Sequence, residues 1–292
     1  MGIKSLKDMK ASSNEATRKL AERIDQQDKG NFQPDERFWN ITKSKENGTG
    51  YAVIRFLPAR PGAEVDELFV RIFSHGFQGP GGWFIHNCPT TLEKNCPVCE
   101  ANSQLWQTGN DDLRKIASQR KRKLSYIANI YVVEDRDNPQ NEGKVFLFRF
   151  GKKIFEKIQE AMNPDDEDES PINVFDFWNG ANFKLKLTQQ AGFNNYDKSK
   201  FAAAGPLSDD DDELDTIWNM EHDLSEFIAA DQFESYETLQ KAFERNLGKP
   251  QTTSGETIVE GSDDDDVPFT PNNEGGEDQS AEDYFKQYQS ED

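Results

Sequence analysis

The chain contains few cysteines and few histidines, three of each among 292 residues. Three cysteines cannot all pair and no apolar signal peptide opens the sequence, so we expect no disulfide framework. Apolar runs long enough to span a bilayer are also missing, and Leu6 stands where N-myristoylation needs Ser or Thr. These absences predict a soluble intracellular protein without membrane contact.

Sequence signals of catalysis are missing too. The pattern G-x-x-x-x-G-K-[ST] and the dinucleotide-binding glycine pattern are absent, which excludes the commonest motors and redox enzymes. A zinc deaminase needs His-x-Glu beside its metal, whereas the sequence reads His75-Gly-Phe and His86-Asn-Cys. We therefore predict a protein that is not an enzyme.

Positive charge is in deficit, because 34 Lys and Arg face 54 Asp and Glu, for a net charge of −20. The acids are clustered: 13 lie in residues 249–292 and ten more in 165–169 and 209–213. Elsewhere 32 basic residues face 31 acidic ones, and residues 114–123 place six positive charges in ten positions. The acidic total therefore does not exclude a nucleic-acid partner for the body of the chain.

The cysteines and two of the histidines share one stretch of 25 residues. Cys96 and Cys99 have the two-residue gap with which neighbouring thiolates bind one zinc ion. Three thiolates and one imidazole complete a tetrahedral shell, so we predict one structural Zn²⁺ bound by His75, Cys88, Cys96 and Cys99. His86 is an alternative fourth ligand. Three buried thiols near unrelated histidines are the alternative to any metal site.

Short alternating segments bounded by turn residues predict a small barrel built from several strands. We expect strands at residues 51–58, 68–73, 83–86, 125–133, 144–150 and 182–188. Helical spacing appears at 152–162 and again from about 213 to 247, which indicates helices that support the barrel.

Three segments follow from composition. Residues 1–29 are predicted to form a basic, amphipathic arm for self-association, with Lys4, Lys7 and Lys10 at its tip; a helix packed on its own domain is equally consistent with the spacing. Residues 30–248 form the core. Residues 249–292 are acidic and lack periodicity, so we expect a disordered tail whose terminal aromatics dock on protein partners.

Basic and aromatic residues are interleaved in the core, as in proteins that bind single-stranded nucleic acid through phosphate attraction and base stacking. Phenylalanine in a strand is usually core and a lysine run is usually a solvated face, but the pairing occurs three times. The candidate DNA-binding residues are Arg120, Lys121, Arg122, Lys123, Tyr126, Phe148, Lys152, Phe193, Tyr196 and Lys198.

Seven ordered motifs within residues 45–201 resemble the single-stranded DNA-binding proteins of T-even-type tailed phages. They are Tyr51-Ala-Val-Ile-Arg-Phe-Leu-Pro58, the His75…Cys88…Cys96-Pro-Val-Cys99 set, Lys121-Arg-Lys…Ser125-Tyr126…Ala128-Asn129-Ile130, Asn141-Glu-Gly-Lys-Val-Phe146, Arg149-Phe-Gly-Lys-Lys-Ile154, Gly180-Ala-Asn-Phe183 and Gly192-Phe-Asn-Asn-Tyr-Asp-Lys-Ser-Lys-Phe201.

This resemblance implies a mainly β core with some α, namely a five-stranded OB-fold barrel with a zinc-stapled subdomain. It implies a protein that coats and protects unpaired DNA without sequence preference and removes its secondary structure during phage replication, recombination and repair. The arm would bind neighbouring protomers, and the tail would recruit a helicase loader, a polymerase and a recombination mediator in the cytoplasm of the infected bacterium. Two positions depart from the family: Ile127 replaces a tryptophan and Phe148 a tyrosine. A zinc-stapled adaptor that binds only proteins is the rival interpretation.

Overall fold

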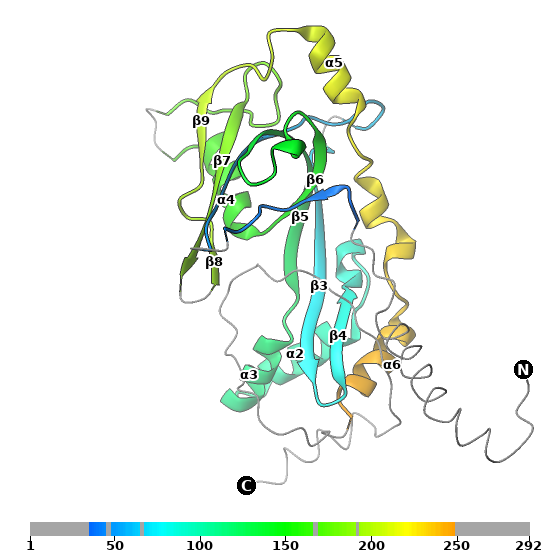
Figure 1. Ribbon diagram of the computed structural model, residues 1–292. Coiled ribbons are helices and arrows are strands. Elements are labelled where there is room, and N and C mark those ends of the chain that lie inside the picture. Colours follow the sequence, from blue (N-terminus) through cyan, green and yellow to red (C-terminus); the bar gives the residue numbers. More distant parts are fainter. Residues whose placement is uncertain (1–34, 45–47, 65–66, 166–168, 191–192, 249–292) are drawn as a thin grey trace, which may run out of the picture.

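The computed structural model describes residues 35–44, 48–64, 67–165, 169–190 and 193–248 (Figure 1). The predicted arm with Lys4, Lys7 and Lys10, and the predicted tail 249–292, lie outside these residues. Within the described ranges, every helix is too short or too polar to cross a bilayer.

Nine strands pair into one sheet around the long strand β5 (Lys123–Asp135). The main path runs β1-β6-β5-β2-β7-β8; β3 pairs with β4 and β5, and β9 pairs with β7. All pairs are antiparallel except β1 with β6. The other strands are β1 (Phe38–Trp39), β2 (Gly50–Phe56), β3 (Val70–Gly79), β4 (Gly82–Asn87), β6 (Val145–Phe150), β7 (Ala181–Gln190), β8 (Phe193–Asn195) and β9 (Lys200–Ala204).

All six predicted strands are confirmed, although their ends differ by a few residues. The pairings among the described residues follow an open path and do not join its outer strands into a ring. The fold is therefore a mixed α/β structure with one large sheet.

The helices are α2 (Pro97–Gln107), α3 (Asp111–Gln119), α4 (Lys152–Met162), α5 (Asp211–Asn219) and α6 (Tyr236–Asn246), with short 3₁₀ turns between several of them. The helix predicted at 152–162 is confirmed as α4. The predicted 213–247 region divides into α5 and α6, with two short 3₁₀ turns between them, Ser225–Ile228 and Ala230–Gln232. Asp223 accepts from the backbone N–H of Ser225, and Ser235 caps α6.

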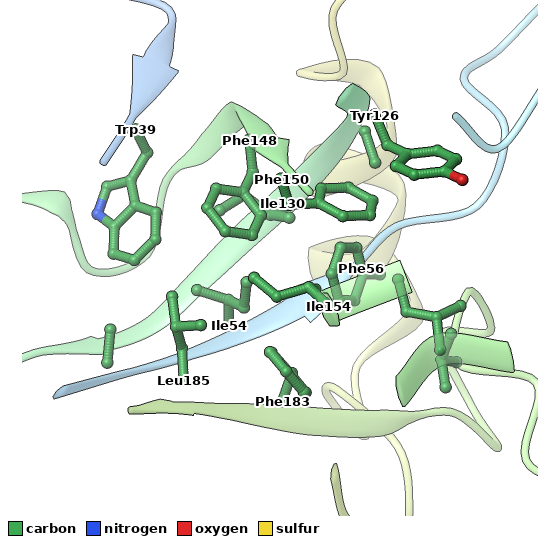
Figure 2. Close-up of a cluster of buried hydrophobic side chains, with 14 of the residues drawn as sticks. Trp39, Ile54, Phe56, Tyr126, Ile130, Phe148, Phe150, Ile154, Phe183 and Leu185 are labelled. Atoms are coloured by element: carbon green, nitrogen blue, oxygen red, sulfur yellow. The ribbon is translucent and has the colours of Figure 1, made fainter. Parts of the chain in front are cut away.

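Central strand β2 explains why the main core forms here. Six of its seven residues are buried, so both of its faces are covered. Ile54 and Phe56 pack with Phe183 on β7 and Phe150 on β6, and Ile154 of α4 packs against the same cluster (Figure 2). Burial of each such side chain contributes about 1.5–3 kcal/mol.

Arg55 is a buried cation within β2, with 2 % of its surface exposed. Its guanidinium donates to the side-chain oxygen of Asn182 at 2.9 Å and to the backbone carbonyls of Asp176 at 3.0 Å and Gly205 at 2.9 Å. Burial lowers the pKa of Arg55, and the charge of Asp176 raises it in part. Three neutral acceptors thus replace water and tie β2 to two loops.

A second core forms a lobe beside the sheet, where the far end of the β3–β4 hairpin packs against α2 and α6 (Figure 1). Phe77 and Phe84 stack with ring centroids 5.1 Å apart and meet Phe243 of α6. We call this unit the hairpin lobe: residues 73–107 together with α6. Because the apolar core of the hairpin lobe is small, we expect hydrogen bonds and a metal site to contribute to its stability.

The tip of the hairpin lobe is held by the last residues of α6. The side-chain N–H of Asn246 donates to the carbonyl of Gly82 at 2.6 Å, and the backbone carbonyl of Asn246 accepts from the N–H of Gly81 at 2.8 Å. A Cβ atom on Gly81 would meet the carbonyl oxygen of Arg245 at 1.9 Å. Only glycine allows this close approach of two backbones.

Candidate metal centre and nucleic-acid interface

The four predicted zinc ligands meet inside the hairpin lobe. His75 lies on β3, Cys88 directly follows β4, Cys96 is the N-cap of α2 and Cys99 lies in its first turn. Their ligand atoms all lie within 4.8 Å of one another. The fold therefore brings the three cysteines and His75 together in one cluster, as their spacing predicts.

The distances within this cluster fit a tetrahedral ion. His75 Nε2 lies 3.5 Å from the sulfur of Cys96 and 3.4 Å from that of Cys99, and the sulfurs of Cys88 and Cys99 are 3.6 Å apart. Zn–S bonds of about 2.3 Å and a Zn–N bond of about 2.0 Å would give S–S separations of roughly 3.8 Å and N–S separations of roughly 3.5 Å. His86 pairs with His75 across the hairpin but does not belong to the cluster, so His75 is the histidine placed to bind.

A backbone carbonyl selects which nitrogen of His75 faces the sulfurs. His75 Nδ1 lies 3.0 Å from the carbonyl oxygen of Arg120, which also accepts from Asn102 at 3.0 Å. An Nδ1–H that donates to this oxygen leaves Nε2 with its lone pair toward the cysteines. Such an outer hydrogen bond fixes the tautomer and the orientation of a metal-binding histidine.

The electrostatics of the cluster also favour a cation. Hydrogen bonds with Cys96 and Cys99 lower the pKa of the Cys88 thiol, and hydrogen bonds with Cys88 and Cys96 raise that of Cys99. Burial lowers the pKa of His75, but hydrogen bonds with Cys88 and Cys96 outweigh it and bring the value to about 9. The groups therefore share protons that a bound cation would replace.

Basic residues 120–123 of the predicted strip lie at and just before the start of β5, which we call the basic end of the sheet. Lys121 and Arg122 are exposed, and Lys123 is half-buried at the start of β5. Tyr126 on β5 pairs with Phe150 on β6 in antiparallel register. The start of β5 and the end of β6 therefore meet at the same end of their ladder, where α4 begins at Lys152.

The start of α4 also contacts the loop that carries the remaining candidates. Lys153 Nζ lies 3.6 Å from a carboxylate oxygen of Asp197, and Lys157 donates to its backbone carbonyl at 3.2 Å. Tyr196, half-buried, and Lys198, exposed, flank Asp197, while Phe193 is half-buried on β8. Two predicted groups of basic and aromatic residues are thus connected through α4.

Three predicted DNA contacts are buried instead: Arg120 is 5 %, Tyr126 4 % and Phe148 5 % exposed. The Tyr126 ring stacks on Phe155 of α4 with centroids 4.0 Å apart, Phe148 packs edge-on against Trp39, and Arg120 lies over the rings of Phe77 and Phe243. Figure 2 shows the Tyr126 and Phe148 rings among the core side chains. Helices and strands cover both faces of this part of β5 and β6, which explains the burial, and the assignment of these three residues to DNA binding stays a prediction.

The candidate list leaves out three cations beside its members, of which Arg71 is exposed and Lys153 and Lys157 are half-buried. Arg71 on β3 lies opposite Tyr126 and is exposed, and Lys153 and Lys157 of α4 face Asp197. Alternation within the 68–73 strand could have indicated Arg71, and helical spacing the two lysines. Arg114 and Lys115, part of the basic strip, lie on α3, where each pairs with an aspartate three residues earlier.

Comparison of the sequence with known proteins identifies its family. Residues 48–247 match the family described as gp32 DNA binding protein like. The chain is 41 % identical over 228 residues to the "Single-stranded DNA-binding protein" of Enterobacteria phage T2, which covers 75 % of the chain and 73 % of the relative. The protein of that name from Enterobacteria phage T4 is 40 % identical over 227 residues, with the same coverage. The match spans both the metal cluster and the basic end of the sheet. It shows that the chain belongs to the gp32-like family of phage DNA-binding proteins.

Proposed function

We propose that this protein binds single-stranded DNA without sequence preference and coats it. It would thereby protect unpaired DNA and remove secondary structure during phage replication, recombination and repair. The observation that carries the proposal is the family match over residues 48–247, supported by relatives named for single-stranded DNA binding. Binding requires no chemical step, and the protein is not an enzyme.

The contacts are proposed to form at the basic end of the sheet. Exposed cations there attract phosphates, and the half-buried rings of Phe193 and Tyr196 stack with bases for about 1–3 kcal/mol each. The exposed cations are Lys121, Arg122, Lys152 and Lys198, and the half-buried Lys123 is included with them. Binding of the unpaired strand alone shifts the equilibrium away from hairpins.

We assign the metal as one Zn²⁺, because a compact His/Cys₃ set is typical of structural zinc. When bound, the ion would join β3, the end of β4 and α2 and so complete the hairpin lobe. The finer prediction that the sheet is a five-stranded OB barrel is kept here as a proposal, on the strength of the motif resemblance.

The remaining assignments extend the proposal to partners. Residues 1–29, with Lys4, Lys7 and Lys10, would bind neighbouring protomers, and residues 249–292 would recruit the helicase loader, polymerase and recombination mediator in the host cytoplasm. Charge supports both roles, since residues 1–29 carry a net charge of +2 and residues 249–292 one of −11.

The test is a fluorescence titration with poly(dT) and with duplex DNA across a salt series. We expect tight, salt-dependent binding to the single strand alone. Lys121→Gln and Lys198→Gln each lower the slope of log K against log [salt] by about 0.7, because each removes one phosphate contact. The matched control, Lys241→Gln at an exposed position on α6, leaves the slope unchanged.

Substitution of the rings tests stacking separately. Phe193→Leu and Tyr196→Leu keep apolar bulk but lose the flat face, so affinity falls about tenfold each while the salt slope stays the same. No binding by the full chain to poly(dT) would refute the proposal and favour the protein adaptor.

A further inference from the structure

The loop that follows β4 is tied to β3 through one residue, Phe73. The backbone N–H of Cys88 donates to the Phe73 carbonyl at 2.7 Å, and the Phe73 N–H donates to the hydroxyl of Thr91 at 2.9 Å. The loop, which includes the 3₁₀ turn Pro89–Leu92, therefore has a fixed position relative to the sheet. Its other threonine, Thr90, is not used for this attachment.

The hydroxyl of Thr90 lies between a metal ligand and a candidate DNA contact. Its oxygen is 3.1 Å from the sulfur of Cys88 and accepts a hydrogen bond from Nη1 of Arg122. A hydroxyl group can donate one hydrogen bond while it accepts another, so it can serve the thiolate and the guanidinium together. No side chain caps the 3₁₀ turn, which removes capping as the reason for a hydroxyl here.

Arg122 is held on its other side by an aromatic ring. Its guanidinium carbon lies 4.0 Å from the ring centroid of Phe73, within cation–π distance. The Arg122 side chain is nevertheless exposed. With five N–H donors, one directed to Thr90, the guanidinium keeps donors for a phosphate while its position is set.

Charge connects this position to the metal. Three thiolates around a divalent ion leave the site with a net charge of −1, which attracts a nearby cation. The thiolate of Cys88 also accepts more strongly from the Thr90 hydroxyl than a thiol does. Loss of the ion, with protonation of the thiolates, weakens both effects.

We infer that Thr90 is a positioning residue that couples the metal centre to DNA binding: its hydroxyl joins Cys88 to Arg122, and the loaded site thereby fixes one phosphate-binding guanidinium. The inference rests on the proposed function and adds a residue that neither the basic-aromatic pattern nor the ligand spacing indicates. It makes metal binding and DNA binding mutually reinforcing through a single hydroxyl group.

Thr90→Val tests the coupling, since it keeps the shape of the side chain and removes the hydroxyl. In full-length protein, competition with a chromophoric chelator should show zinc bound about tenfold more weakly, as expected when a partner of a metal ligand is lost. At saturating zinc, the salt slope for poly(dT) should fall by up to about 0.7. Thr90→Ser restores both values, and Thr216→Val, which removes an exposed hydroxyl on α5, changes neither.

Arg122→Gln identifies the path. Its slope falls by about 0.7, and Thr90→Val added to it lowers the slope no further, because both changes remove one contact. Failure of the unmodified chain to bind poly(dT) would refute the proposed function. Binding with native slope and native zinc affinity in Thr90→Val, or a loss that Thr90→Ser does not restore, would overturn the coupling alone.

Discussion

Glu221 is a buried carboxyl group whose charge the fold does not satisfy. Both of its side-chain oxygens are shielded from solvent and lack a hydrogen-bond partner among the described residues. Burial raises its pKa from 4.5 to about 9, although the charge of Arg60 opposes the change. Arg60 instead forms its ion pair with Asp223, at 2.8 Å.

The sign of the resulting pH dependence follows from proton uptake. Between pH 4.5 and 9 the folded protein holds a proton on Glu221 that the unfolded chain releases, so the free energy of unfolding falls as pH rises. Each pH unit in this range costs up to about 1.4 kcal/mol, and the total at pH 7 reaches at most about 3.4 kcal/mol. Below pH 4.5 both states are protonated and the cost disappears.

Glu221→Gln removes this cost because the amide is neutral at every pH. Urea unfolding at pH 5.5 and at pH 8 should show the variant more stable than the native protein at pH 8, by a margin that grows by up to about 1.4 kcal/mol per pH unit. Glu160→Gln, an exposed position on α4, controls for the loss of one negative charge. An advantage of Glu221→Gln that is the same at both pH values would refute the reasoning.

Further outcomes test the metal, the buried cation and the tail. Cys99→Ser should bind zinc far more weakly in chelator competition and should have a lower melting temperature. Unchanged zinc affinity and melting temperature would argue against the metal centre. Arg55→Met should lower the free energy of unfolding by about 3 kcal/mol in urea, because three acceptors lose their donor; a native midpoint would contradict this. Gly180→Ala should cost a similar amount, since its Cβ would lie 2.2 Å from the Asp176 carbonyl oxygen, and native stability would refute this. Truncation after Gly248 should raise DNA affinity at low salt, since it removes 13 acids that compete for the basic surface; unchanged affinity would refute this competition.

Strands and metal ligands were accessible to sequence reasoning because each depends on a local pattern. Apolar and polar residues alternate in the sequence of the 182–188 segment, and buried and half-buried side chains alternate in the same way in β7. The ligand set followed from cysteine spacing together with the coordination number of zinc. The choice of His75 over His86 required the structure, since both histidines lie on the hairpin.

Helices α2 and α3 could not be predicted in the same way. Helix α3 has only nine residues, and its apolar stripe of Leu113, Ile116 and Ala117 is too short to stand out beside its charged residues. Likewise, the burial of Tyr126 could not be predicted from alternation, because five consecutive residues of β5, from Tyr126 to Ile130, are buried. Where neighbouring elements cover both faces of a strand, the side chain that meets solvent depends on tertiary packing.

The attachment of α6 to the β3–β4 hairpin determines when the lobe can be completed during synthesis. All four metal ligands have been translated by residue 99, but Leu239, Phe243 and Asn246 come much later, and the bond from Asn246 to Gly82 spans 164 residues. A contact of this separation pays a large loop-closure entropy and forms late. The four candidate ligands are therefore in place well before the apolar face of the hairpin is covered, and that face depends on the last helix for protection from aggregation.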